Sequence, residues 1–555
     1  MSAPPLARST RRSRACPGAR ARDAGRDVAP GEPGRKDGSP PVRGAAVVLG
    51  MVLALAGSGA FGVRTPGSRN PASGAVAWAG DDASLAALRR RLEEPDPATR
   101  AAAVRRLSGA LDEASIRLVV ATLSDPHPYV RRAAAGVLGV VLDVGVRNRV
   151  LREAPDWKSA AARVDVTRAF AAWADRDGRA GLLRALGDRD AAVRAAASGW
   201  LGEDPDEAAG RALIVATSDA DALVRATAFD ALRARSALRG ATTVGVPLSA
   251  GNRDRDPRVR LSALESSVAA GTDTAVFAVI HGLDDAVWSV RLVAAELAGA
   301  VRDRRVLAPL IAALRDARDR VAQTAATALL RLTGIPFGVD PARWATWLAG
   351  DGATFDPSTV PDRKVVAFEA GGGTVAPVKF MDLAVASGHV AFVLDASGSM
   401  AERDAAGTSR WDRVRDEVGH VLERLGTGAE GNVILFADAA TPLFRSAVRF
   451  TPAAREKVGE ALAAHPPAGR TALYDGIAKA LEDPAIDTVV VLSDGAPSAG
   501  SFFTKTDLRT EVRKANRWRR ARIDVVAVGA DDVAKRWRSL LRDLAEDTGG
   551  RFVAK

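Results

Sequence analysis

The sequence predicts an α-solenoid followed by an α/β domain with a doubly wound, mainly parallel sheet. A motif built around Val-Arg recurs through the first part, mostly at a step of 31 residues, and helical Ala-rich sequence follows each copy. In the last part, apolar strand-like segments alternate with amphipathic helical ones. A chain of 555 residues is also too long for one hydrophobic core.

The N-terminal tail, residues 1–43, is rich in Arg, Pro, Gly and Ser and is expected to be disordered. Ten Lys/Arg and four Asp/Glu give it +6 of the chain's net charge of +11. The rest of the chain shows no basic patch with interleaved aromatic residues, so no nucleic-acid partner is expected. The single cysteine, Cys16, lies in the tail, which excludes a disulfide framework and a Cys-based zinc site.

Residues 44–63 form an uncharged, mostly apolar run that predicts a signal peptide or one membrane-spanning anchor. Small-x-small cleavage sites occur at Ala54-Leu-Ala56 and Ala77-Trp-Ala79, and residues 64–80 are interpreted as a linker. The expected location is the cell envelope, with the protein membrane-anchored or secreted into the periplasm or beyond. The alternative is a chance Ala-rich stretch in a cytoplasmic protein.

The predicted solenoid covers residues 81–350. Asp-x-Asp or Asp-Pro in each copy makes a turn and caps the next helix, and the Val and Ala residues that follow face neighbouring helices. A double step between Arg131 and Arg194 implies a degenerate copy near Arg163 or Arg168. The repeat arginines are Arg100, Arg131, Arg194, Arg225, Arg260 and Arg291.

This pattern resembles HEAT repeats of the short, bacterial kind. The repeat arginines are expected to bridge to the turn aspartates of adjacent repeats, which would make an inter-repeat ladder. The alternative is a basic groove for an acidic partner. Residues 336–350, with Trp344 and Trp347, are expected to form a short helix that closes the solenoid with a hydrophobic cap.

Residues 351–385 are Gly/Pro-rich and are interpreted as a linker with two strand-like pieces, 365–368 and 378–380. A strand docked on the C-terminal domain is the alternative for this segment. The C-terminal domain follows as residues 386–555. Its strands are expected at residues 389–395, 432–437, 443–450, 487–493, 522–529 and 550–554.

The motif Asp395-Ala-Ser397-Gly-Ser399 follows directly on an apolar strand. One carboxylate and two hydroxyls at alternate positions of a tight turn suit a small hard cation such as Mg²⁺. Thr471 and Asp494 lie in two further loops, at the start of a helix and at the end of a strand. Open α/β sheets place their ligand sites at such an edge.

Residues 386–555 resemble a von Willebrand factor A-type domain, and the closing segment 544–552 looks like the last helix and edge strand of that family. The resemblance implies a metal-ion-dependent adhesion site for Mg²⁺, with Mn²⁺ or Ca²⁺ as alternatives. Three side chains would contact the metal and two would bind it directly or through water; they are Ser397, Ser399 and Thr471, then Asp395 and Asp494. Arg470 departs from the pattern, because many relatives carry Gly there.

Nothing in the sequence indicates an enzyme. The motif loops hold no histidine to act as a base, and the chain has no Gly-x-Ser-x-Gly elbow, Walker loop or His-Glu-x-x-His. We therefore expect an interaction or adhesion protein whose bound metal accepts an Asp or Glu carboxylate from a protein partner. The alternative is a cytoplasmic assembly or chelatase-type factor that works with an ATPase, and a weaker option is a scaffold with an incidental metal site.

Overall fold

The computed structural model of the protein describes residues 85–109, 112–239, 246–361, 377–494, 496–529 and 532–555. The predictions for residues 1–43, 44–63, 64–80 and 365–368 lie outside these ranges. Within the described ranges, no helix is both long and apolar enough to cross a bilayer.

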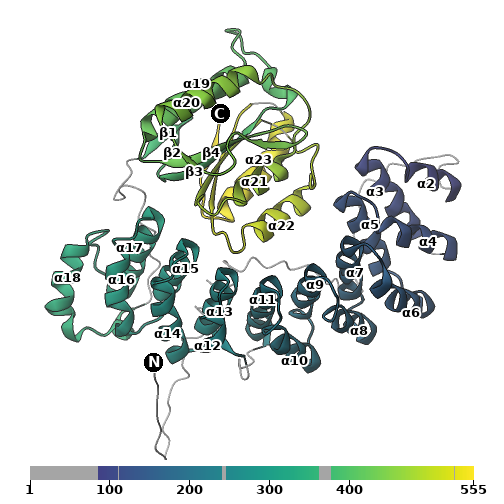
Figure 1. The fold of residues 1–555 in the computed structure, drawn as a ribbon, viewed down its shortest axis with the longest axis horizontal. Coiled ribbons are helices and arrows are strands. Elements are labelled where there is room, and N and C mark those ends of the chain that lie inside the picture. The colour runs from purple at the N-terminus through teal and green to yellow at the C-terminus, as the bar shows by residue number, and fades with distance from the viewer. Residues whose placement is uncertain (1–84, 110–111, 240–245, 362–376, 495, 530–531) are drawn as a thin grey trace, which may run out of the picture. The chain divides into compact units, whose positions relative to one another are not determined.

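The first part of the chain is a helical solenoid, as predicted (Figure 1). Helices α3, α5, α7, α9, α11, α13, α15 and α17 pack against one another in order, and most of the helices between them form a second layer. The helices are α2 (Leu85–Arg91), α3 (Pro97–Arg106), α4 (Glu113–Thr122), α5 (Pro128–Gly139), α6 (Val144–Glu153), α7 (Ala160–Trp173), α8 (Arg176–Ala185), α9 (Ala191–Leu201), α10 (Glu207–Ala216), α11 (Ala222–Arg239), α12 (Leu248–Gly251), α13 (Pro257–Ala270), α14 (Thr272–Leu283), α15 (Trp288–Ala298), α16 (Leu307–Ala313), α17 (Asp319–Thr333) and α18 (Pro341–Ala349). Short 3-10 turns are η2 (Leu107–Gly109), η3 (Ala154–Asp156), η4 (Arg304–Val306), η5 (Asp351–Thr354) and η6 (Pro357–Thr359).

The turn aspartates cap the helices that follow them. The side chain of Asp96 accepts a hydrogen bond from the Thr99 amide at the start of α3, and Asp190 and Asp256 do the same for α9 and α13. Pro occupies the first turn of α3 and α13, where no amide hydrogen is needed. At the other end of the solenoid, Trp344 on α18 is fully buried, as expected for a closing cap.

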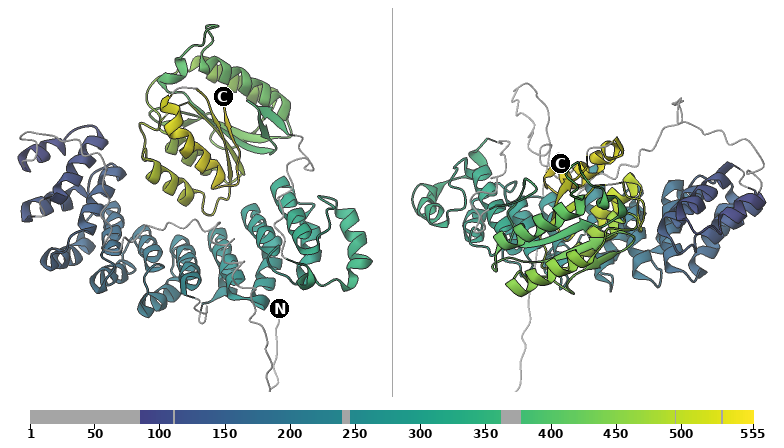
Figure 2. Two further views of the ribbon diagram at one scale, coloured as in Figure 1. Left: turned by 180° about the vertical axis from the view of Figure 1, so that it is seen from behind. Right: turned by 90° about the horizontal axis from the view of Figure 1, so that it is seen from above.

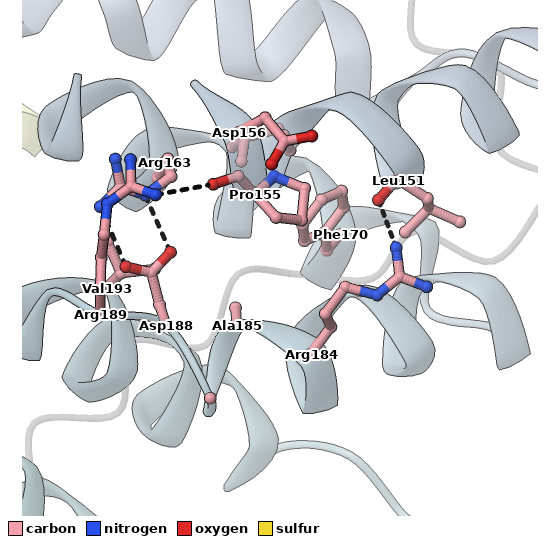
Figure 3. Close-up of a pocket in the computed structure, with 14 residues that line it drawn as sticks. Leu151, Pro155, Asp156, Arg163, Phe170, Arg184, Ala185, Asp188, Arg189 and Val193 are labelled. Atoms are coloured by element: carbon pink, nitrogen blue, oxygen red, sulfur yellow. Dashed lines mark hydrogen bonds and ion pairs between the residues drawn. The ribbon is translucent and has the colours of Figure 1, made fainter. Parts of the chain in front are cut away.

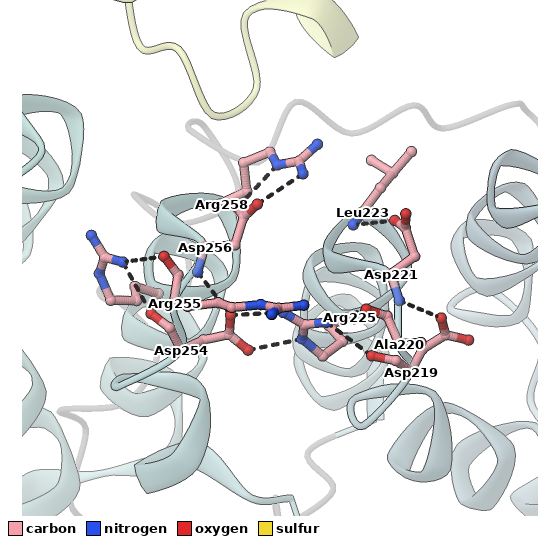
Figure 4. A network of polar contacts seen from close by, with 10 residues as sticks. Asp219, Ala220, Asp221, Leu223, Arg225, Asp254, Arg255, Asp256 and Arg258 are labelled. Carbon is pink, nitrogen blue, oxygen red and sulfur yellow. Dashed lines mark hydrogen bonds and ion pairs between the residues drawn. The ribbon is translucent and has the colours of Figure 1, made fainter.

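The predicted inter-repeat ladder is confirmed, except that Arg131 pairs with Asp165 inside α7 and not with a turn aspartate. Each repeat arginine donates to an aspartate of the next repeat and also to backbone carbonyls five or six residues before it in sequence. Figure 4 shows this for Arg225, whose guanidinium lies 2.8 Å from both carboxylate oxygens of Asp254 and 2.9 Å from the Asp219 carbonyl oxygen. The pairs are Arg100–Asp125, Arg131–Asp165, Arg163–Asp188, Arg194–Asp219, Arg225–Asp254, Arg260–Asp285 and Arg291–Asp316.

Arg163 is the degenerate copy, whereas Arg168 lies over the Trp200 ring. Figure 3 shows Arg163 at the wall of a cavity of about 310 Å³ between α6 and α9. Its guanidinium binds Asp188 and the Trp157 carbonyl oxygen. Because the ladder arginines are engaged in this way, the alternative of a basic groove made by them is not supported.

The second part is a seven-stranded sheet with the order β5-β4-β3-β7-β8-β9, and β6 pairs with β4. Pairing is parallel from β4 to β9, and only β5 and β6 run antiparallel. The elements are β1 (Val378–Phe380), β2 (Leu383–Val385), β3 (His389–Asp395), η7 (Gly398–Ala401), α19 (Arg410–Leu425), β4 (Glu430–Phe436), β5 (Ala440–Pro442), β6 (Val448–Arg449), α20 (Pro452–Ala464), α21 (Leu473–Leu481), β7 (Thr488–Ser493), α22 (Lys505–Ala515), β8 (Arg522–Ala527), α23 (Asp532–Glu546) and β9 (Phe552–Ala554).

Helices cover both faces of this sheet (Figures 1 and 2). Along β3, Phe392 and Leu394 pack under α19 and α20, while Ala391 and Val393 pack on the side of α21, α22 and α23. A strand that is apolar on both faces is typical of the middle of a parallel sheet. The doubly wound fold is therefore confirmed.

One local prediction is corrected, and one alternative is supported. The single strand expected at 443–450 is wrong, because β5 and β6 are separate short strands. Between them, the Asn432 side chain bonds the amide and the carbonyl oxygen of Phe444, where a regular ladder would use backbone groups. The strand-like piece 378–380 docks on the C-terminal domain as β1, which pairs with β2 in a hairpin whose apolar side chains, Phe380 among them, join the core under α19. The C-terminal core therefore begins before residue 386.

An ion-pair cluster joins the segment before β8 to residues of helices α11 and α13. Arg517 donates to Asp230 at 3.0 Å and also pairs with Glu265, to which Arg520 donates as well. Burial would raise the pKa of the Glu265 carboxyl, but the guanidinium groups of Arg517, Arg520 and Arg233 outweigh it and hold the pKa at about 2.

Val224→Asp should unfold the solenoid. Val224 is fully buried on α11, so the change places an unpaired carboxylate between helices and should cost about 3 kcal/mol or more. The matched control is Val215→Asp on α10, where the valine is 74% exposed. Urea denaturation followed by circular dichroism should show a large loss for Val224→Asp and little change for Val215→Asp. Arg225→Lys should fall in between; equal effects of the two aspartates would contradict the packing described.

Glu265→Gln should lower the free energy of unfolding at pH 7 by about 3 kcal/mol, because buried guanidinium groups lose their counter-charge. The folded-state pKa of Glu265 lies below its ordinary value of 4.5, so its stabilising contribution is present above pH 4.5 and is lost as the pH falls toward 2. The difference in the free energy of unfolding between the wild type and Glu265→Gln should therefore become smaller as the pH falls. Glu207→Gln, which removes an exposed partner of Arg211, is the control and should change little.

Candidate metal site

The five predicted site residues lie at one edge of the sheet. Asp395 is the last residue of β3, and Asp494 follows the last residue of the neighbouring parallel strand β7. Ser397 and Ser399 lie in the turn after β3, and Thr471 lies just before α21. Because β3 and β7 run in the same direction, their carboxyl ends meet, and both carboxylates reach the same edge.

Hydrogen bonds tie the three loops together. The Ser399 hydroxyl donates to Asp494 Oδ1 at 2.9 Å, and the hydroxyl oxygens of Ser397 and Ser399 are 3.1 Å apart. The Gly398 amide donates to the Gly469 carbonyl oxygen at 3.1 Å, which holds the loop of Thr471 against the Asp-x-Ser-x-Ser turn. The structure thus brings together the three loops that the sequence separates by about 100 residues.

Asp395 is completely buried, and both of its carboxylate oxygens accept hydrogen bonds. The Ser397 amide donates to Oδ1 at 3.0 Å and the Ser493 hydroxyl donates to Oδ2 at 2.6 Å. Burial raises the pKa of Asp395 to about 6; the bonds from Ser397 and Ser493 oppose this rise, and the charge of Asp494 adds to it. Among the residues that the structure describes, no Lys, Arg or His side chain pairs with this carboxylate.

The negative charge of Asp494, unlike that of Asp395, is balanced by an arginine. Its second oxygen, Oδ2, accepts a hydrogen bond from the Arg410 guanidinium at 2.7 Å, and Arg410 also binds Glu402 at 2.6 Å. Arg410 is the first residue of α19, where Ser409 and Asp412 form a capping box. Sequence reasoning missed Arg410 and Ser493, although Ser493 directly precedes a predicted ligand.

The loop of Thr471 is braced from behind. The Thr471 amide donates to the Ser498 hydroxyl at 3.1 Å, and the Ser498 amide donates to the Thr471 carbonyl oxygen at 3.0 Å. The Thr471 side-chain hydroxyl, on a residue only 5% exposed, makes no hydrogen bond to any residue that the structure describes. Arg470, next to it, is largely exposed and pairs with Asp438 at 2.9 Å.

The donor set fits a hard divalent cation. It consists of carboxylate and hydroxyl oxygens, which Mg²⁺ and Ca²⁺ prefer, and it includes the buried hydroxyl of Thr471. Across the described residues there is no group of three or more His, Cys, Asp or Glu side chains that could hold a metal. A metal at this edge would thus depend on the Ser and Thr hydroxyls as well as on the two carboxylates.

The architecture is that of a helical-repeat protein ending in a doubly wound domain, and sequence profiles assign both parts. The profile of the von Willebrand factor type A domain matches residues 389–555, and that of HEAT repeats matches residues 72–145. Residues 389–555 are therefore a von Willebrand factor A (VWA) domain and residues 72–145 match HEAT repeats, so the resemblance seen in the sequence is confirmed for both parts. Both families generally serve as non-enzymatic interaction domains.

Several solved structures are similar to parts of the chain. A von Willebrand factor type A protein from Catenulispora acidiphila is 21% identical, with a TM-score of 0.26, over 31% of this chain and 40% of its own length. An aerotolerance-related membrane protein from Bacteroides fragilis is 15% identical, with a TM-score of 0.23, over 30% of this chain and 90% of its own. The E. coli protein YibA is 19% identical, with a TM-score of 0.32, over 45% and 92%. No match was found among curated proteins.

Asp395→Asn should stabilise the metal-free protein at pH 7.5 by about 1–3 kcal/mol, because it removes a buried charge without a positive partner and keeps the side-chain shape. The folded-state pKa of Asp395 lies above its ordinary value of 3.8. Its favourable contribution is therefore present below pH 3.8 and is lost as the pH rises through about 6.

Thermal melts in EDTA between pH 4 and 8 should show this difference growing with pH. Added Mg²⁺ should raise the melting temperature of the wild type and leave Asp395→Asn unchanged. Asp438→Asn, at an exposed carboxylate, is the control and should keep the response to metal. A variant less stable than the wild type in EDTA at pH 7.5 would contradict the burial argument.

Proposed function

We propose that this protein is a non-enzymatic interaction or adhesion protein that binds its partner through a divalent cation held in the VWA domain. The proposed ligands are Asp395, Ser397, Ser399, Thr471 and Asp494, and the proposed ion is Mg²⁺, with Mn²⁺ or Ca²⁺ as alternatives. The observation that carries the proposal is the hydrogen bond from Ser399 to Asp494, which joins the Asp-x-Ser-x-Ser turn to the end of the neighbouring strand.

The chemistry that a bound cation supplies here is a coordination position for a carboxylate oxygen of a partner. The chain's own residues fix the loops, keep two carboxylates at the sheet edge and direct the Ser397 and Ser399 hydroxyls toward each other. An Asp or Glu side chain is the protein ligand that completes such a shell best.

The same residues offer poor support for catalysis. A serine nucleophile needs a base within hydrogen-bond reach, most often histidine. No histidine in the described ranges hydrogen-bonds to Ser397 or Ser399. The two hydroxyls lie within hydrogen-bond distance of each other, and that of Ser399 donates to Asp494. A binding role is therefore the simpler use of the site, and the HEAT repeats would add a scaffold, since one metal–carboxylate bond cannot define an interface of standard size.

The proposed location is the cell envelope, through residues 44–63 as a signal peptide or membrane anchor. The competing hypothesis is a cytoplasmic assembly or chelatase-type factor that works with an ATPase. Fractionation of the native source, with N-terminal sequencing of the mature protein, separates the two. A chain that starts after residue 63, or that stays in the membrane fraction after a carbonate wash, supports the envelope, and an unprocessed chain in the soluble fraction supports the alternative.

The binding proposal is tested by selecting from a random displayed-peptide library on the immobilised full chain in Mg²⁺. We expect peptides enriched in Asp or Glu, released by EDTA and lost in Thr471→Ala, because the latter removes a hydroxyl ligand while the fold is kept. Thr346→Ala, at an exposed threonine of α18 whose hydroxyl bonds its own helix, is the matched control. Acidic peptides that survive both EDTA and Thr471→Ala would show that binding belongs to another surface.

A further inference from the structure

We propose that Arg410 is a built-in counter-cation of the candidate metal site, and that it must leave Asp494 for Glu402 when a divalent cation binds. Arg410 thereby sets the metal affinity of the site. This inference rests on the proposed function, because it concerns the same carboxylates, but it adds a residue outside the Asp-x-Ser-x-Ser pattern and a mechanism for regulating the site.

The first argument is the occupancy of Asp494. Its side chain is fully enclosed, Oδ1 accepts from Ser399 at 2.9 Å, and Oδ2 accepts from Arg410 at 2.7 Å. The guanidinium therefore neutralises one of the two carboxylates of the site. A divalent cation bound to Asp494 would be repelled by a guanidinium on the same carboxylate, so the two compete for it.

The second argument is the position of Arg410 on its helix. Arg410 is the first residue of α19, and a cation at a helix N-terminus is disfavoured by the helix dipole. Two carboxylates, Asp494 and Glu402, hold the side chain there. The Arg410 backbone amide also donates to the Glu402 carbonyl oxygen at 3.0 Å, so Glu402 stays beside Arg410 through the backbone as well.

The third argument is the space around the guanidinium. The guanidinium lies close to Gly529, because a carbon atom placed on that glycine, which has a φ of +103°, would come within 3.3 Å of it. Arg410, Glu402 and Gly529 all line one cavity of about 780 Å³, so there is open space beside the guanidinium. Glu402 is 59% exposed, whereas Arg410 is 20% exposed. The Arg410 side chain can thus turn away from Asp494 and toward the cavity while it keeps its ion pair with Glu402.

These contacts predict opposite effects for the two partners. Without the guanidinium, Asp494 carries its full charge toward the metal, so Arg410→Gln should bind Mg²⁺ and Mn²⁺ about tenfold more tightly than the wild type. Without Glu402, the displaced guanidinium loses the carboxylate that lies beside it at 2.6 Å, so Glu402→Gln should bind about threefold to tenfold more weakly. Arg410→Lys keeps the charge and should stay close to the wild type.

The test is isothermal titration calorimetry of the full chain with Mg²⁺ and with Mn²⁺, with a thermal melt of each variant in EDTA to verify folding. The set is wild type, Arg410→Gln, Arg410→Lys, Glu402→Gln and the double variant Arg410→Gln/Glu402→Gln. The control is Arg413→Gln, which removes a partly exposed arginine of the same helix that pairs with Asp404. We expect Glu402→Gln to lose its effect once Arg410 is Gln.

Three results would overturn the inference. If Arg410→Gln binds metal with the same affinity as the wild type, or more weakly, the Arg410 guanidinium does not compete with the metal for Asp494. If Glu402→Gln lowers the metal affinity equally with and without Arg410, the Glu402 carboxylate attracts the metal directly and does not act through Arg410. The absence of metal binding in every variant removes the proposed function and this inference together, whereas wild-type binding that is insensitive to Arg410 leaves the proposed function standing.

Discussion

The central position of β3 in the sheet is the constraint on which the candidate site depends. Strand β3 pairs in parallel with β4 on one side and with β7 on the other, and all its residues after His389 are buried. Its register with β7 places Leu394 opposite Leu492, so Asp395 and Ser493 end the two strands side by side. The short bond between Asp395 and Ser493, and the approach of Asp494 to the Asp-x-Ser-x-Ser turn, both follow from this register.

The two carboxylates at this edge are kept in low dielectric surroundings by different means. Asp395 relies on an amide and a hydroxyl, which leaves its pKa raised to about 6. The carboxylate of Asp494 is paired with the positively charged guanidinium of Arg410. The site is therefore asymmetric. The Asp395 carboxylate could pair with an added cation, whereas the Asp494 carboxylate is already paired with Arg410, which a metal would have to displace.

The sequence was most informative where local pattern and tertiary contacts agree. The limits of β3 could be predicted because a continuous apolar run ends in a carboxylate, and the arginine ladder could be predicted because its spacing repeats. The strand at 443–450 was wrong because the Asn432 side chain takes over backbone bonds there, which no period in the sequence reveals. Arg410 escaped notice because its partner Asp494 lies 84 residues away. The metal assignment itself stays a prediction.

The arginine ladder also has a consequence for how this chain can change length. Arginine and aspartate are 25 residues apart in most pairs, but 29 for Arg225–Asp254, and the ion pair is kept in both cases. Arg131 instead pairs with Asp165, which lies 34 residues further on and inside α7. The connection between the two partners can therefore differ in length without loss of the ion pair. Insertions and deletions between a ladder arginine and its aspartate can be accommodated without breaking the ion pair between neighbouring repeats. These connections are therefore the positions at which new sequence can be inserted with the least effect on the solenoid.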